Sequence, residues 1–100
     1  MTKLLIPLGK TQPLFLLGMV TATPGFLDWA EANSVNYGQY VALHVTGDYG
    51  TMDAEDVQAN KDSIKYGNRI MSEYEVDGTK FWIITEADRS VTTLLLPNEY

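Results

Sequence analysis

Two residues in the last third of the chain, Asp77 and Gly78, separate two runs rich in aromatic and β-branched side chains, 69–76 and 79–86. This dipeptide is the strongest short signal for a β-hairpin, because both residues tolerate the positive φ angles of a two-residue turn. The pattern therefore predicts two antiparallel strands whose register starts at this turn. A slip of one residue would move every side chain to the opposite face of the sheet.

Opposite charges support the same register independently of the turn. It sets two carboxylates opposite two bases, in the pairs Glu75–Lys80 and Arg69–Glu86. Cross-strand pairs of opposite charge stabilise an antiparallel ladder. We therefore expect the members of each pair to lie side by side in the folded chain.

A third strand follows after a four-residue loop, 87–90, and its pairing decides which side chains share a face. Pairing Glu86 with Val91 continues the meander through 91–96, and alternation along the strands sorts the side chains into two sets. The face expected to meet the core carries Ile70, Tyr74, Val76, Phe81, Ile83, Leu94 and Leu96. The other, amphipathic face carries Met71, Trp82, Ile84 and Leu95 together with Glu73 and Glu75.

The first two thirds of the chain predict an arm, a strand and three helices. Residues 1–13, interrupted by prolines and a glycine, are expected to form an irregular arm, and the apolar run 14–21 predicts a buried strand. Capping residues then mark the helices. The first begins at Thr23 and Pro24 and runs to Ala32, the second is capped by Asn36 with Gln39 and ends at Gly47, and the third is capped by Asp53 and stops at Gly67.

Together these elements predict one α+β domain over residues 14–100. An N-terminal strand and three helices precede a three-stranded antiparallel meander that packs on the helices, and the N-terminal strand can add to the edge of that sheet. A chain of 100 residues with a hydrophobic share of 45% has room for one such core.

Charge and composition limit the function. A net charge of −6 at pH 7 disfavours binding to a phosphate backbone and suits docking on a basic partner protein. The absence of cysteine favours the cytoplasm, and the apolar run is too short to cross a membrane. No cofactor-binding motif occurs, so we expect no cofactor. We expect no metal either, because the spacing of a calcium loop is absent from Asp48, Asp53, Glu55 and Asp56.

His44 is the only histidine, so any imidazole chemistry depends on it. In the expected register Thr85 and Thr92 are neighbours on the core face, with Ser72 about one pair away. A helix that brings His44 over these hydroxyls would create an acid–base site with hydroxyl stabilisers. The same residues also suit a hydrogen-bonded core histidine beside ordinary strand threonines, and both interpretations stay open.

Three segments resemble a family of small bacterial proteins that are carried largely on plasmids and other mobile elements. They are 22–27 (ATPGFL), 44–50 (HVTGDYG) and 82–97 (WIITEADRSVTTLLLP), followed by Glu99-Tyr100. Some members bear a label that ties them to the M subunit of type I restriction systems. The resemblance covers roughly residues 20–100 and implies a mobile-element context, and we carry no methyltransferase activity over from it.

The order of the elements resembles a second group, the ribonuclease toxins of the barnase, EndoU and RelE type. That resemblance implies His44 as the acid–base group, Arg69 or Arg89 as a phosphate-binding group, and Thr85 and Thr92 as positioning residues. The acidic charge of this chain departs from the basic face that such enzymes present to RNA.

Three functions are therefore consistent with the sequence. The first is an accessory protein of a plasmid or phage that acts by protein–protein contact, with host restriction or CRISPR machinery as its target class. The second is the ribonuclease-like enzyme, and the third is a homo-oligomeric scaffold that uses an edge strand at 91–96. The candidate contact residues for the first function are Trp82, Met71, Glu73, Glu75, Asp48, Tyr49 and Arg89.

Overall fold

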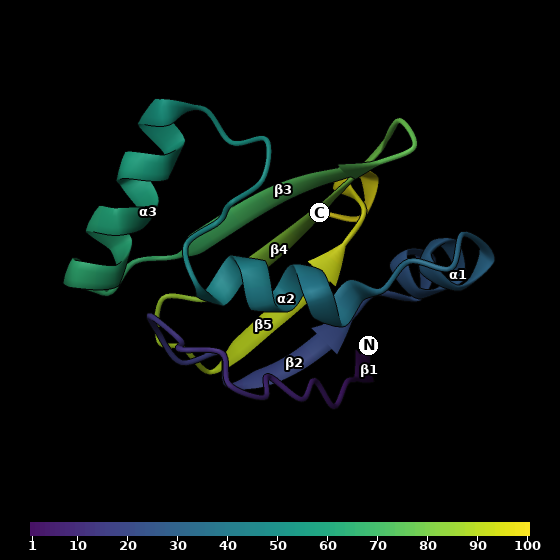
Figure 1. Ribbon diagram of the computed structural model, residues 1–100, viewed down its shortest axis with the longest axis horizontal. Helices are drawn as coiled ribbons and strands as arrows, with labels where there is room; N and C mark the ends of the chain where they lie inside the picture. The colour runs from purple at the N-terminus through teal and green to yellow at the C-terminus, as the bar shows by residue number, and fades with distance from the viewer.

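Five strands form one mixed sheet in the computed structural model, which describes residues 1–100 (Figure 1). Their order across the sheet is β1-β2-β5-β4-β3. β2 and β5 run parallel, and the other neighbouring pairs are antiparallel. The elements are β1 (Thr2–Lys3), β2 (Met19–Ala22), α1 (Pro24–Ala32), α2 (Tyr37–Val45), α3 (Ala54–Tyr66), β3 (Ile70–Val76), β4 (Thr79–Thr85), β5 (Val91–Leu95) and the 3-10 helix η1 (Pro97–Glu99).

The hairpin of β3 and β4 has the register expected from its turn. Val76 pairs with Thr79, and the φ angles of Asp77 and Gly78 are 49° and 82°. Two successive residues with positive φ make a type I′ turn, whose twist matches that of the two strands. The predicted register is confirmed.

Only one of the two predicted cross-strand charge pairs forms. Arg69 lies 3.3 Å from Glu86, as the register predicts. Lys80 stands opposite Glu75 in the ladder, but its amino group lies 3.6 Å from Glu73 instead. Glu73 is a diagonal neighbour, and a lysine side chain is long enough to reach such a position. Glu75 is left exposed.

The C-terminal meander forms one side of a larger sheet, with β5 in the centre. β5 pairs with β4, with Thr92 opposite Thr85, and on its other side pairs with β2. The prediction of an edge strand at 91–96 was therefore wrong, and the homo-oligomeric scaffold loses the surface assigned to it. The N-terminal strand does add to the edge of the meander, as expected. Its choice of β5 and its parallel direction escaped prediction, because β2 and β5 come from opposite ends of the chain and local sequence patterns carry no information about their pairing.

The N-terminal strand is shorter than the apolar run predicted. Only residues 19–22 belong to β2, because Gly18 turns the chain with a φ of 63°. At this turn the backbone of Gly18 lies against that of Arg89 and Ser90, where a Cβ atom has no room. The N–H of Met19 then donates to the carbonyl of Ser90 over 2.9 Å. The apolar run is thus divided at Gly18: the residues before it lie outside the sheet and those after it belong to β2.

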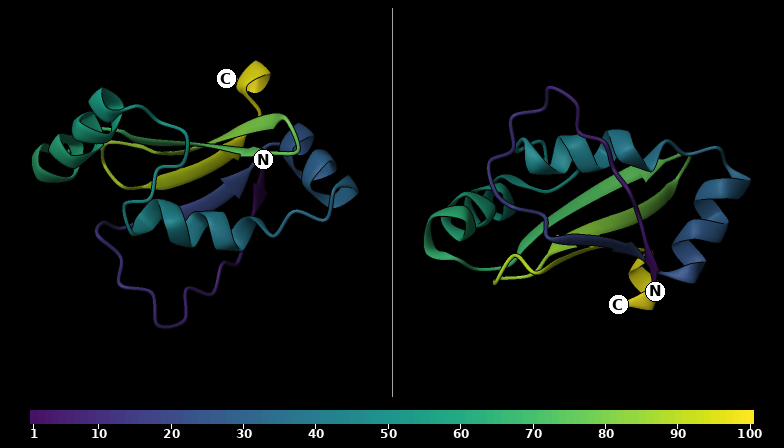
Figure 2. Two further views of the ribbon diagram at one scale, coloured as in Figure 1. Left: turned by 45° about the horizontal axis from the view of Figure 1, so that its top comes forward. Right: turned by 90° about the horizontal axis from the view of Figure 1, so that it is seen from below.

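The irregular arm predicted for residues 1–13 includes a short strand. β1 is antiparallel to β2, and the N–H of Leu4 donates to the carbonyl of Val20 over 2.8 Å. The chain then loops away and returns at Leu14, whose N–H donates to the carbonyl of Val45, also over 2.8 Å. Figure 2 shows this loop on the same side of the sheet as α2.

Two of the three predicted helix N-caps are confirmed. The side chains of Thr23 and Asp53 each accept a hydrogen bond from the backbone N–H three residues later, and Gly67 ends α3 with a φ of 76°. The prediction for Asn36 was wrong, because its side chain makes no capping hydrogen bond. Its ψ of 82° is far from the extended value of the other two caps, so its carboxamide is not aimed at the helix N–H groups.

The core lies between the sheet and the layer formed by α1, α2 and the N-terminal segment (Figure 2). Phe26 of α1 packs on Phe81 of β4 with ring centroids 5.2 Å apart. The predicted core face is confirmed for its five most buried members, Ile70, Tyr74, Phe81, Ile83 and Leu94. η1 lies on the opposite face of the sheet, which we call the outer face, whereas α3 lies along the edge strand β3 (Figure 2).

The edge strand β3 is covered rather than open. The carboxamide of Asn60 on α3 bonds both backbone groups of Met71, over 2.7 and 3.1 Å, as a neighbouring strand would. Further along, the loop before α3 bonds both backbone groups of Glu73 through Tyr49 and Thr51. These contacts occupy hydrogen-bonding groups through which a strand edge could pair with another chain.

Glu99 joins η1 to the start of α1, which gives a first prediction. Its carboxylate accepts hydrogen bonds from the Thr23 hydroxyl (2.6 Å) and from the N–H groups of Gly25 and Leu96 (both 3.1 Å). We expect Glu99→Gln to lower the unfolding free energy by about 1–2 kcal/mol, because charge-assisted bonds are lost. Urea denaturation measures this, with the exposed Glu31→Gln of α1 as control; equal effects of the two substitutions would contradict the assignment.

Candidate functional site

His44 lies over the hydroxyl groups of the sheet, an arrangement that the sequence left open. Its Nδ1 is 2.6 Å from Ser72 Oγ on β3, and its Nε2 is 2.9 Å from Thr85 Oγ1 on β4. Thr85 Oγ1 lies 2.7 Å from Thr92 Oγ1 on β5, which in turn donates to the carbonyl of Leu17 over 2.7 Å. One helix and three strands thus contribute to a continuous hydrogen-bonded chain, which we call the His44 network.

The last bond of the His44 network determines where its protons lie. Thr92 uses its only proton for Leu17, so it must accept from Thr85. Thr85 then has no proton left for the ring, and His44 must donate from Nε2. Nδ1 remains as the acceptor for the Ser72 hydroxyl. A neutral imidazole protonated at Nε2 therefore satisfies every partner.

The His44 network is closed to solvent. The side chains of His44, Ser72, Thr85 and Thr92 have no exposed surface, and Phe15 packs edge-on against the imidazole with ring centroids 5.3 Å apart. Burial lowers the pKa of His44 from 6.5 to about 3. General acid–base catalysis needs a group that reaches the substrate proton and titrates near the working pH. The geometry therefore favours the core-histidine interpretation over the catalytic one.

The two candidate phosphate-binding arginines are not brought to His44. Arg69 bonds Glu86 and the hydroxyl of Tyr100 on the outer face, because alternate residues of a strand point to opposite sides. Arg89 is bound to the backbone: its guanidinium donates to the carbonyls of Asn68 (2.7 Å), Ser63 (2.9 Å), Glu86 and Ala87 (both 3.1 Å). Neither assignment as a phosphate-binding group next to His44 fits this arrangement.

Trp82 and Met71 lie half-buried on the outer face, as predicted. The indole N–H of Trp82 donates to Glu73 over 2.8 Å, and its ring packs edge-on against Tyr100 with centroids 5.5 Å apart. The hydrogen bond from Trp82 contributes most to lowering the pKa of Glu73 below its usual value. Glu73 is thus engaged within the chain, whereas Glu75 points to solvent.

A hollow of about 400 Å³ opens on the outer face beside Tyr100. Its apolar lining includes Ile84 and Leu95, which are almost fully buried. Glu86 and Glu99 contribute carboxylates; no Lys or Arg lines the hollow itself, and Arg69 pairs with Glu86 beside it. Such a hollow suits a long basic side chain, which has an apolar stem and a charged end. We call this feature the outer hollow.

Asp48 and Tyr49, the other candidate contact residues, differ in position. Asp48 is exposed, and its backbone carbonyl accepts the Tyr74 hydroxyl over 2.6 Å. Tyr49 is buried between α2 and α3, with only 3% of its surface exposed, so its assignment as a contact residue is not supported. Its backbone carbonyl accepts from the N–H of Glu73, which fixes the residue against β3 and directs the side chain inward.

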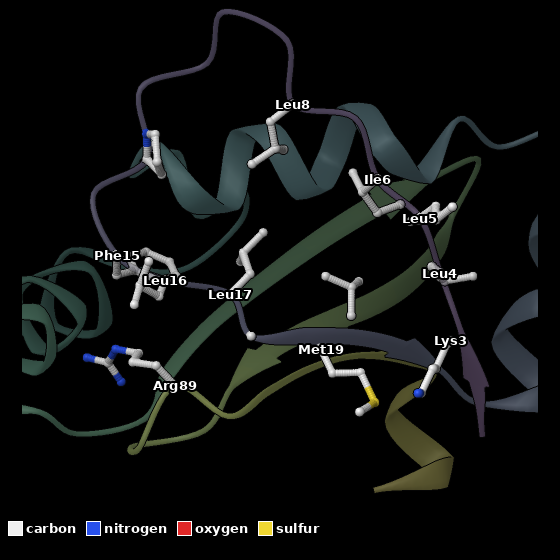
Figure 3. Close-up of a pocket in the computed structure, with 13 residues that line it drawn as sticks. Lys3, Leu4, Leu5, Ile6, Leu8, Phe15, Leu16, Leu17, Met19 and Arg89 are labelled. Atoms are coloured by element: carbon white, nitrogen blue, oxygen red, sulfur yellow. The ribbon is translucent and has the colours of Figure 1, made fainter.

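The largest hollow in the molecule, about 660 Å³, was missed by the sequence analysis. It lies between the segments 3–8 and 13–20, and nine of its thirteen lining residues are hydrophobic. Figure 3 shows Leu8 and Leu17 directed toward it and Lys3 and Arg89 at opposite ends. We call this feature the N-terminal groove.

Large apolar side chains around the N-terminal groove are exposed. Leu5 has 98% of its surface exposed, Leu16 74% and Leu14 54%. The prediction of a fully buried strand at 14–21 was wrong here, since Phe15 and Leu17 turn toward the core while Leu14 and Leu16 turn outward. A glycine inside the apolar run, at position 18, was the available signal for this change.

Charge is segregated along the chain. Residues 1–27 contain Lys3 and Lys10 and no acidic residue. Residues 28–100 contain all thirteen acidic residues and the other five of the seven basic ones, so their net charge is −8. The N-terminal groove and the rest of the molecule therefore have opposite electrostatic character.

No helix has both the length and the apolar composition that crossing a bilayer requires. No group of three or more His, Cys, Asp or Glu side chains is arranged to hold a metal ion. The chain matches no protein-family model, no curated protein and no solved structure.

Proposed function

We propose that this protein is a non-catalytic accessory protein that binds a basic partner protein through the outer face of its sheet. The observation that carries the proposal is the outer hollow. Its apolar lining, formed in part by Ile84 and Leu95, is accompanied by the carboxylates of Glu86 and Glu99, and only Glu86 is paired with a base, Arg69 at the rim. An arginine or lysine side chain of a partner would be complementary to it in both shape and charge.

The surroundings of the outer hollow support a protein as the ligand. Tyr100 is 69% exposed and packs against the half-buried Trp82, and aromatic residues of this kind are frequent anchors in protein interfaces. The net charge of −8 over residues 28–100 would steer a basic surface toward this part of the molecule. Association is then expected to weaken as salt rises.

The resemblance of segments 22–27, 44–50 and 82–97 to mobile-element proteins supports a class of partner. Restriction and CRISPR enzymes bind nucleic acid and therefore carry basic surfaces. An acidic protein from a mobile element could occupy such a surface. We propose host defence enzymes of this kind as the target.

The substitution Thr93→Arg tests this proposal. Thr93 is half-buried and lines the outer hollow, so an arginine there would place a positive charge next to Glu86 and Glu99. We expect the wild-type protein to raise the transformation of unmodified plasmid into a host with active type I restriction severalfold. Thr93→Arg should abolish this increase in transformation. The parallel assay measures transformation of a plasmid that the host's CRISPR system targets.

Gln58→Arg on α3 is the matched control, because it adds the same charge at an exposed site away from the outer hollow. It should keep the full effect. Equal activity of the Thr93→Arg and Gln58→Arg variants would remove the outer hollow from the proposal. If the wild-type protein is well expressed but protects the plasmid in neither assay, host defence enzymes are not its partners.

One observation favours the ribonuclease alternative, namely the 2.9 Å distance between His44 and Thr85. Catalysis would require Phe15 and Leu17 to move away from the His44 network, since His44 has no exposed surface. Incubation of the protein with single-stranded RNA tests this. Cleavage by the wild type that is lost in His44→Gln would establish the alternative and contradict our proposal.

A further inference from the structure

We infer that the N-terminal groove is a second docking surface and that it binds an acidic amphipathic helix of a partner protein. This inference goes beyond the function proposed above and does not depend on it. The two surfaces differ in position and in charge, so the protein would connect two unlike partners.

The occupant must be large, because the groove is open. In an enclosed pocket for a small molecule, the ligand and the protein cover the lining side chains together. Here Leu5 and Leu16 line the groove while 98% and 74% of their surfaces are exposed. Only a macromolecular surface would cover these leucines together with the groove between them. Contiguous exposed apolar surface of this kind marks an interaction site.

A helix fits this groove better than a lipid surface does. The groove is concave, with a volume of about 660 Å³ between two chain segments (Figure 3). A concave apolar surface is complementary to the apolar face of an amphipathic helix, which presents anchors at i, i+3, i+4 and i+7.

Charge complementarity favours an acidic helix as the partner in the groove. Lys3 lines the groove, Lys10 lies in the loop that joins its two segments, and residues 1–27 contain no acidic side chain. Arg89 at the other end bonds backbone carbonyls, which do not neutralise its charge. A helix with Asp or Glu beside its apolar face would therefore be preferred over a basic one.

Selection from a display library of 16-residue helical peptides tests the inference with the full-length protein. We expect enriched peptides to combine apolar residues at helical spacing with a net negative charge. Their affinity, measured by fluorescence anisotropy, should fall at least tenfold with Leu16→Glu and should also fall with Lys3→Glu. Leu16 is mostly exposed, so its substitution should leave the fold intact, which a thermal melt checks.

Two controls separate this surface from others. Tyr66→Glu replaces a residue that is 67% exposed on α3, and it should leave peptide affinity unchanged. Thr93→Arg should also leave it unchanged, so failure of the outer hollow and failure of the groove are distinguishable.

Four results would overturn the inference. In the first, no enriched peptide binds the wild type more tightly than it binds the Leu16→Glu variant. In the second, the enriched peptides are basic. In the third, the wild type binds phosphatidylglycerol vesicles and Leu16→Glu abolishes this binding, and in the fourth the wild type is a dimer in solution that Leu16→Glu dissociates. The third result would assign the groove to a membrane surface, and the fourth to a second copy of this chain.

Discussion

Acidification from pH 7.5 to pH 5 is expected to remove about 2 kcal/mol of unfolding free energy through His44 alone. Burial lowers the pKa of His44 from 6.5 to about 3 in the folded chain. Between these two values the unfolded chain binds a proton that the folded chain does not bind. The contribution of His44 to the unfolding free energy is therefore complete above pH 6.5 and is lost progressively as the pH falls toward 3.

Urea denaturation at several pH values between 7.5 and 5 measures this loss. His44→Gln is the matched variant, because glutamine donates and accepts hydrogen bonds but does not titrate in this range. The wild type should lose about 2 kcal/mol more than the variant over this interval. Equal pH dependence of the two proteins would contradict the closed His44 network.

A second measurement keeps the prediction testable if His44→Gln does not fold. His44 is the only histidine, so its imidazole signals in an NMR titration of the wild type are unambiguous. We expect the ring to stay neutral and protonated at Nε2 throughout the range from pH 7.5 to 5. A midpoint near 6.5 would show that His44 is accessible to solvent and would reopen the catalytic interpretation.

Gly18→Ala is expected to destabilise the protein by about 3 kcal/mol or more, through backbone strain and steric overlap combined. Gly18 has a φ of 63°, and a Cβ atom there would overlap the backbone carbonyl groups of Arg89 and Ser90. The backbones on both sides of this contact are hydrogen-bonded to each other, so neither is free to move away. Relief of the overlap requires the start of β2 to separate from the loop before β5.

Gly9→Ala is the matched control for this prediction. Gly9 lies in the same N-terminal segment and has a similar φ of 58°, but a Cβ atom there meets nothing within 4 Å. It should cost only about 1 kcal/mol, the steric penalty of the left-handed conformation. Similar denaturation midpoints for the two variants would show that the close approach at Gly18 is not a constraint.

Hydrogen exchange of the sheet amides would locate the effect of Gly18→Ala. We expect faster exchange at Met19, whose N–H bonds the Ser90 carbonyl, while the β3–β4 hairpin stays protected. The same separation would weaken the bond from Thr92 to Leu17 and so expose the end of the His44 network.

The candidate site was partly predictable. The turn at Asp77-Gly78 determines the register, so the approach of Thr85 to Thr92 followed from the sequence. The sequence did not decide whether His44 faces them, because that depends on how α2 packs on the sheet. The pKa of His44 did not follow, because it depends on Phe15, which arrives from a distant segment. The role of Arg89 was unpredictable for the same reason, since two of its carbonyl partners lie on Ser63 and Asn68.

The sequence by itself determined the features that depend on residues close together in the chain: the β3–β4 hairpin, the two faces of the meander and the starts of α1 and α3. Tertiary structure alone decided that β5 lies inside the sheet, that the run 14–20 is half exposed and that the N-terminal groove exists. The physical reason is that β2 pairs with β5 only through contacts between the two ends of the chain. Residue patterns within either segment do not encode such contacts, which depend on how the whole chain packs.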